Sequence, residues 1–141
     1  MKNLATCTPT EFILQTAKIK NAVANWLDVT KILEIRGNAP AYKVAPKEAT
    51  AEERAEIIRE NAALQREQVK KNLSEILDQM LVEHPQETLN VLALVCFVEP
   101  SEIDKYTMSE YIGCILEMFQ DKSVISFFTL LAQMQQHPTS I

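Results

Sequence analysis

The chain contains few residue patterns that could perform chemistry. Its two histidines, His84 and His137, each stand directly before a proline, and neither occurs in an HExxH or CxxC context. Histidines at helix boundaries are the simpler interpretation, so we expect no metal site. The only glycines, Gly37 and Gly113, cannot form a GxGxxG or GxxxxGK[ST] loop. The sequence therefore predicts no nucleotide site of these types.

The nucleophiles and carboxylates give no clearer sign of catalysis. Cys7, Cys96 and Cys114 are odd in number and lack close pairing, and two of them lie in apolar runs, which is typical of buried free thiols. No spacing pairs a cysteine with a histidine base. The carboxylates of "AEERAEIIRE" alternate with arginines, as on a solvated helix face, whereas acid–base catalysis needs desolvated carboxylates. We expect a non-enzymatic protein without a cofactor.

Composition limits the class of protein further. With 141 residues, 47% of them apolar and 23% charged, and a net charge of −5, the chain has the values of one globular domain. The acidic balance and the dispersed basic residues disfavour nucleic acid as a partner. The longest apolar run is about half the length that spans a membrane, and the N-terminus has no apolar signal region. We therefore expect a cytoplasmic protein that does not bind membranes.

Three expected helix starts share one sequence pattern. "TPTE", "TAEE" and "TMSE" begin at Thr8, Thr50 and Thr107, and each places a threonine three residues before a glutamate. In such a capping box the hydroxyl accepts from the third helical N–H, and the glutamate accepts from the threonine N–H. Pro9 suits the first helical position because its missing N–H is not needed there.

The helical pattern extends over most of the chain. Apolar residues recur at three-and-four spacing, which predicts an all-α fold, a compact bundle of about five main helices. The expected helices cover residues 8–27, 51–83, 86–98, 108–120 and 122–136, with a short one over 28–37 that ends at Gly37. The helix over 51–83 is long and highly charged in its first half. We expect one domain over 1–141, with an N-terminal helical arm (1–37), a proline-containing loop (38–49) and a main helical body (50–141).

The run "LNVLALVCFVEP" allows two interpretations. Pro85 suits a first helical position and Pro100 closes the element, which favours a buried helix of about 13 residues. Because Val91, Val95 and Val98 are β-branched and the run is continuous, a buried strand is the alternative. In the first helix, Trp26 shares a face with apolar neighbours, and we expect it to anchor that helix to the core.

Apolar residues are in excess near the C-terminus. "YIGCILEMF" and "VISFFTLLAQM" carry large residues on more than one helical face, either because both helices are central to the core or because part of the surface binds a partner. Two overlapping stripes of the last helix contain Phe127 and Phe128 respectively, and we expect one stripe to be core and the other interface. The candidate partner-binding residues are Tyr111, Met118, Phe127, Phe128, Leu131 and Met134.

Charge is also uneven along the chain. Residues 1–47 contain seven Lys/Arg and three Asp/Glu, whereas residues 84–141 contain two and seven. This asymmetry could help the parts of one chain to dock, or it could guide self-association between copies.

Three phrases of the sequence resemble a known class of proteins: "NLATCTPTEFILQTAKIKNAVANWLDVTKILEIR", "NLSEILDQMLVEHPQETLNVLALVCFVEP" and "VISFFTLL". They resemble small proteins encoded in the tail-gene region of phages and prophages of Firmicutes, the tail assembly chaperones. The resemblance implies a mainly helical protein that binds the tape-measure protein during tail assembly in the host cell. It implies no catalytic residues.

A helical adaptor or regulatory module unrelated to tails would share every feature named so far. Gene neighbourhood separates the two interpretations, because adjacency to a tape-measure gene favours the chaperone.

Overall fold

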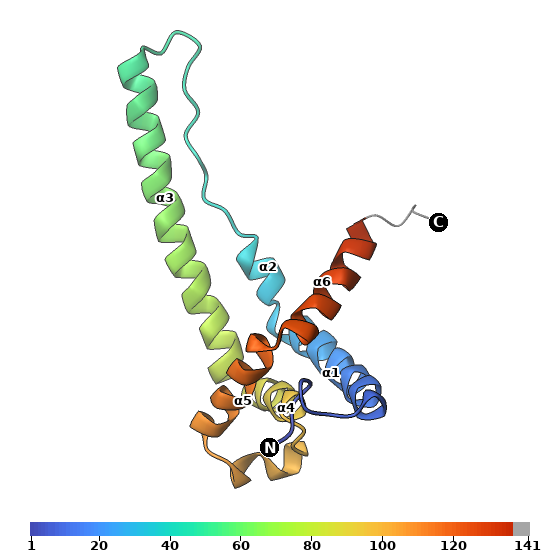
Figure 1. Cartoon of the computed structure of the whole chain (residues 1–141). Helices are drawn as coiled ribbons and strands as arrows, with labels where there is room; N and C mark the ends of the chain where they lie inside the picture. The colour runs from blue at the N-terminus through green and yellow to red at the C-terminus, as the bar shows by residue number, and fades with distance from the viewer. Residues whose placement is uncertain (137–141) are drawn as a thin grey trace. The chain divides into compact units, whose positions relative to one another are not determined.

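A computed structural model describes residues 1–136 of the protein (Figure 1). The predicted all-α class is confirmed: the structure is 77% helical, has no strand among the described residues and contains five helices of seven residues or more. No helix in this part of the chain is long and apolar enough to cross a membrane. The elements are α1 (Pro9–Thr30), α2 (Ile32–Arg36), α3 (Ala51–Asp78), the π-helix η1 (Gln79–Glu83), α4 (Pro85–Val95), the 3-10 helix η2 (Pro100–Lys105), α5 (Met108–Gln120) and α6 (Lys122–Gln136).

The three predicted helix starts are confirmed. At α1 the Glu11 N–H donates to the Thr8 hydroxyl at 3.2 Å, and the Thr8 N–H donates to the Glu11 carboxylate at 3.1 Å. Thr107 begins α5 with the same reciprocal box. Thr50 accepts from the third residue of α3 at 3.1 Å. Short side chains therefore satisfy backbone donors that a helix leaves unpaired in its first turn.

The first of these caps should make stability depend on pH. A hydrogen bond from Lys2, whose ammonium lies 2.6 Å from the carboxylate, and further bonds from Thr8 hold the pKa of Glu11 at about 2. A folded-state pKa below the ordinary value of 4.5 means that this stabilisation is present above pH 4.5 and is lost as the pH falls toward 2. In an NMR titration, Lys2→Ala should move the Glu11 midpoint upward. A midpoint that does not move would show that Lys2 has no effect on this carboxylate.

Two helix ends differ from the predicted ones. The first helix continues past Leu27 to Thr30, and the break falls at Lys31, whose φ of 54° is left-handed and cannot continue the helix. Helix α4 ends at Val95 and not near Val98, because Phe97 also has a positive φ of 57°. There the Val98 N–H donates to the Ala93 carbonyl at 2.9 Å and the Phe97 N–H to the Leu94 carbonyl at 3.2 Å, which is a Schellman motif. The strand alternative for this run is therefore wrong.

Packing divides the chain into two compact units. The first, called unit 1 here, comprises Met1–Trp26 and the chain from Gln86 onward, and unit 2 comprises Leu27–Pro85. These boundaries differ from the predicted arm, loop and body, because the division falls within α1 and at the start of α4. The single domain over 1–141 stays a prediction.

Unit 1 contains the apolar core. One cluster joins α4 to α5 and consists of Ala93, Cys96, Val98, Tyr111 and Cys114. A second joins the N-terminal segment to the last two helices and consists of Leu4, Met118 and Val124. Helix α1 is held to α4 by two polar contacts: Gln15 donates to the Leu94 carbonyl at 2.7 Å, and the indole N–H of the half-buried Trp26 donates to the Thr88 hydroxyl at 2.9 Å. Trp26 thus connects α1 to α4 through a hydrogen bond.

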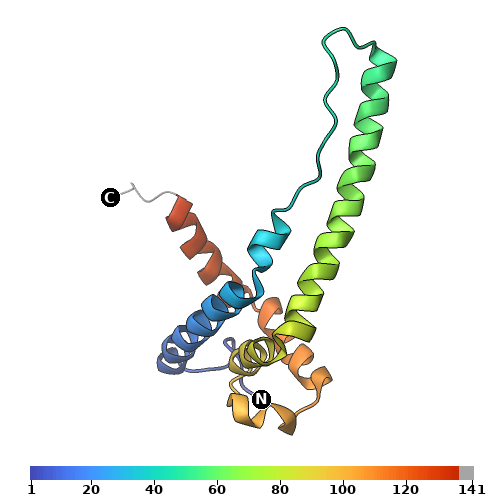
Figure 2. The same cartoon turned by 180° about the vertical axis from the view of Figure 1, so that it is seen from behind.

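Unit 2 is held together differently. Among its residues, all of which are described, only Thr30 and Asn72 are buried. The segment after α2 runs back along α3 in Figures 1 and 2, and polar side chains of α3 hold it there. Asn61 exchanges two hydrogen bonds with the backbone of Lys43, at 2.8 and 2.9 Å, and Asn72 donates to the Asn38 carbonyl at 3.0 Å. The predicted loop therefore follows a defined path on one side of α3.

Candidate protein-binding site

Helix α6 is buried at its start and exposed along the rest of its length. Val124 in its first turn is 8% exposed, Phe127 and Phe128 one turn later are 42% and 41% exposed, and Met134 is 61% exposed. Leu130 and Leu131 are also exposed. Only the first turn of α6 is therefore buried in unit 1, and a large apolar surface continues beyond it.

Three phenylalanines form the contact between α6 and α1. The rings of Phe12 and Phe127 meet edge to face at 5.3 Å, the rings of Phe12 and Phe128 lie 6.4 Å apart, and Phe127 and Phe128 pack at 5.4 Å. Such aromatic pairs add to the stabilisation that apolar burial provides. The structure does not separate Phe127 from Phe128 as core and interface, because both are half exposed and both contact the same ring.

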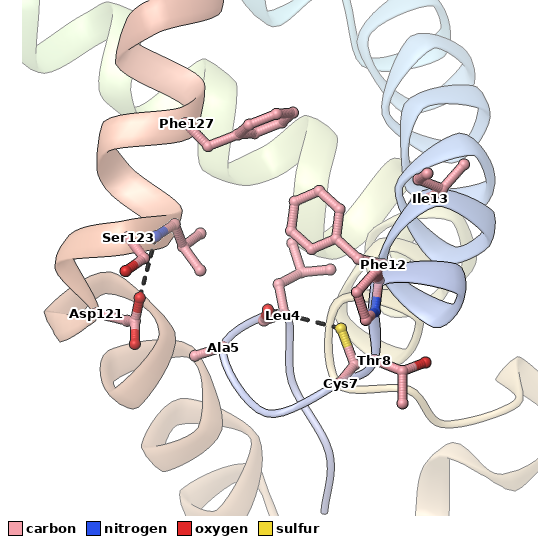
Figure 3. A pocket seen from close by; sticks show the side chains of 11 residues that line it. Leu4, Ala5, Cys7, Thr8, Phe12, Ile13, Asp121, Ser123 and Phe127 are labelled. Carbon is pink, nitrogen blue, oxygen red and sulfur yellow. Dashed lines mark hydrogen bonds between the residues drawn. The ribbon is translucent and has the colours of Figure 1, made fainter.

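An apolar hollow opens beside this aromatic cluster (Figure 3). Its volume is about 550 Å³, and its walls come from the N-terminal segment, the first turn of α1 and the first turns of α6. Leu4, Phe12 and Phe127 point toward one another across it in Figure 3, with Ile13 at the edge. The hollow lies within unit 1 and offers space for large apolar side chains of another molecule.

The charges around this surface lie at one end. Asp121 begins α6 and accepts from the Val124 N–H at 3.0 Å, as a helix-capping carboxylate does. After Lys122, α6 carries no charged side chain as far as Gln136. A charged group brought against this helix would lose hydration without gaining a partner. The surface therefore suits an uncharged face of a partner.

The predicted site residues fall into two groups. Phe127, Phe128, Leu131 and Met134 are exposed, as a binding role requires, and that role stays a prediction. Tyr111 and Met118 are 2% and 9% exposed, so the prediction that they lie on a binding surface is corrected. They belong to the face of α5 that packs into the core, and the Tyr111 hydroxyl donates to the Ile103 carbonyl at 2.6 Å.

The sequence missed two residues of this surface. Leu4 and Phe12 line the hollow from the N-terminal side, although neither was expected at a binding site. The position of Phe12 on the apolar face of α1 was visible in the sequence, but nothing in the pattern placed it against α6. Outside this surface the outer face of α5 is also exposed, with Met108, Ile112, Leu116 and Phe119 at helical spacing. The sequence predicted large residues on more than one face of this helix, but the candidates chosen there, Tyr111 and Met118, lie on the buried face.

The cysteines contribute to packing. All three are free thiols, as predicted, and Cys96 and Cys114 are buried in the α4–α5 cluster. Burial raises the pKa of the Cys96 thiol to about 12, and a hydrogen bond with the Cys114 side chain contributes to the same shift. A thiol with so high a pKa is protonated and unreactive at neutral pH.

This burial predicts the reactivity of the thiols. A disulfide reagent at pH 8 should modify Cys7 alone in the folded protein, because Cys7 is partly accessible, and all three thiols after denaturation. Partial burial raises the pKa of Cys7 as well, so its reaction should be slower than that of free cysteine. Cys7→Ser should remove the native-state reaction. A second thiol that reacts at the rate of Cys7 would show that the α4–α5 cluster opens readily.

Within residues 1–136, no group of three or more His, Cys, Asp or Glu side chains could hold a metal ion. His84 lies at the junction of η1 and α4, as expected of a helix-boundary histidine, whereas His137 lies outside the described residues. The chain matches no protein-family model, no curated protein and no solved structure.

Proposed function

We propose that this protein is a non-enzymatic phage tail assembly chaperone that binds a helix of the tape-measure protein. The observation that carries the proposal is the partly exposed cluster of Phe12, Phe127 and Phe128, with the apolar hollow beside it and the uncharged, exposed length of α6 beyond it. We infer the identity of the client, the tape-measure protein, from the resemblance of the sequence to tail assembly chaperones. Tail assembly takes place in the bacterial host cell, so the proposal places the protein in the host cytoplasm.

The surface suits a helix better than an extended chain. An added strand gains most of its affinity from backbone hydrogen bonds to an exposed sheet edge, and the described residues contain no sheet. A helix instead places side chains at three-and-four spacing into an apolar groove. The length of α6 beyond Val124 allows such packing over about three turns. The client face should be apolar and uncharged, because α6 has no charge to pair with.

Co-expression with a tape-measure protein from the genome that encodes this chain tests the proposal. We expect the two proteins to purify together, and the complex to survive high salt because the contact is apolar. A soluble coiled coil of similar length serves as the control client and should not be retained. Failure to bind the tape-measure protein under conditions in which both proteins are folded would contradict the proposal. Sedimentation of the purified protein alone would show whether the same surface supports self-association.

A further inference from the structure

Helix α3 presents a second apolar surface, separate from the one on α6. Ile58, Val69 and Leu73 are 69%, 58% and 55% exposed, and with Ala62 they recur at intervals of four and seven residues. This spacing places them on one side of the helix. Single exposed apolar residues are ordinary, but several on one side of a helix of 28 residues, interrupted by Gln65 and Arg66, are a feature of binding surfaces. We call this row the α3 stripe.

The α3 stripe does not face the segment that packs on α3 within unit 2. That segment is held by Arg54, Glu60, Asn61 and Asn72. At 100° per residue the four stripe residues lie within about 60° of one another, Glu60 lies about 140° or more from each of them, and Asn61 and Asn72 border the stripe on one side. The exposure of Ile58, Val69 and Leu73 shows that the segment does not cover the stripe.

One edge of the α3 stripe is positively charged. Arg59, Arg66 and Lys70 recur at intervals of seven and four residues, so they form a row parallel to the stripe. An open hollow of about 490 Å³ lies where the two rows meet and is lined by Ala62, Arg66, Val69 and Lys70 among others. The acidic partners of this row are exposed: Glu56 pairs with Arg59, and Glu67 lies 3.6 Å from Lys70. Exposed pairs of this kind are weak and can be exchanged for others.

Arg66 is the cation of this row most available to another molecule. No ion pair with Arg66 is found among the described residues, which include the whole of unit 2. It lies at the hollow between Val69 and Ala62. A guanidinium that lies beside an exposed apolar row can bind a carboxylate bidentately while the aliphatic part of its side chain packs on the partner.

We propose that the α3 stripe binds an acidic amphipathic helix of a partner protein. The apolar side chains of that helix would pack on Val69 and Leu73, and its carboxylates would pair with Arg66 and Lys70. This surface is independent of the proposed client site on α6, because the two sites lie on different units. They also require different partners: the partner of the α3 stripe is charged along one edge, whereas the partner of α6 is uncharged. An anionic lipid surface fits less well, because segments that bind such lipids carry clusters of about four to eight Lys/Arg, whereas this row has only Arg59, Arg66 and Lys70.

The test uses the full-length protein and two labelled helical peptides of about three heptads. Both carry leucine at the core positions; one has glutamate at the flanking positions and the other has lysine. Fluorescence anisotropy should show that the glutamate peptide binds at least tenfold more tightly than the lysine peptide, with a smaller difference at high salt. Circular dichroism of each variant checks that α3 remains helical.

Adjacent lysines provide a matched pair of variants. Lys70 belongs to the charged row, whereas Lys71 is exposed on another side of the helix. Lys70→Glu should weaken binding of the glutamate peptide about fivefold, and the double variant R66E/K70E at least tenfold, whereas Lys71→Glu should change it less than twofold. Leu73→Ser should weaken both peptides. Tape-measure binding through α6 should not respond to these variants, so failure of one proposal is distinguishable from failure of the other.

Four outcomes would overturn this inference. Equal binding of the two peptides would remove the role of charge, and equal effects of Lys70→Glu and Lys71→Glu would remove the role of this edge. Binding to vesicles of phosphatidylglycerol without binding to the glutamate peptide would assign the stripe to a membrane surface. A dimer in sedimentation that Leu73→Ser dissociates would assign it to a second copy of the chain.

Discussion

Replacing Tyr111 with alanine is expected to lower the free energy of unfolding of unit 1 by about 3–5 kcal/mol. Among the described residues Tyr111 is the largest of the fully buried side chains, and it packs between α4 and α5 with Cys96 and Cys114. The substitution leaves a cavity that these neighbours can fill only in part, and it leaves the Ile103 carbonyl without its donor at 2.6 Å. Urea unfolding followed by far-UV circular dichroism measures the loss.

The same helix contains a matched control. Phe119 is also an aromatic residue of α5, but it is 61% exposed. Phe119→Ala should change the free energy of unfolding by no more than about 0.5 kcal/mol. Tyr111→Phe keeps the ring and loses only the hydroxyl, so it should cost about 1 kcal/mol. Similar losses for Tyr111→Ala and Phe119→Ala would show that α5 packs by a different face from the one described.

The helices themselves were predictable because their start signals are local. A threonine followed three residues later by a glutamate specifies where backbone donors are satisfied, and α5 begins directly after Thr107, as predicted. The end of α4 was not predictable in this way. It depends on Phe97 in the left-handed region, a conformation that is usual for glycine and that only packing and the Schellman hydrogen bonds sustain here.

The choice of buried face could not be predicted from periodicity. The apolar residues of α5 lie on more than one face of the helix. Tyr111, Cys114 and Met118 are buried, whereas Ile112 and Leu116 are exposed. A pattern that is apolar on two sides fits burial on either side equally well. The choice depends on α4 and on the N-terminal segment, which approach α5 from distant parts of the sequence. For this reason two of the predicted binding residues proved to be core.

The second large effect is expected at the exposed end of α6, where binding and folding can be separated. Met134→Ser should reduce the affinity for the tape-measure protein at least tenfold and should leave the free energy of unfolding within about 0.5 kcal/mol. The physical reason is that Met134 is 61% exposed and shares one side of the helix with Phe127 and Leu131, at i, i+4 and i+7. It contributes apolar area to a partner and little to the core. Calorimetric titration and thermal unfolding of the same sample measure both quantities.

The neighbouring residue supplies the control for this variant. Gln133 is exposed and lies with Ser126 and Thr129 on the polar side of α6, so Gln133→Ser should change the affinity less than twofold. Phe127→Ser should reduce binding as well, but it also removes the edge-to-face contact with Phe12, so it should cost about 1 kcal/mol of stability. If Met134→Ser and Gln133→Ser weaken the complex equally, the apolar side of α6 does not carry the binding. The exposed outer face of α5, with Ile112, Leu116 and Phe119, would then be the next surface to test.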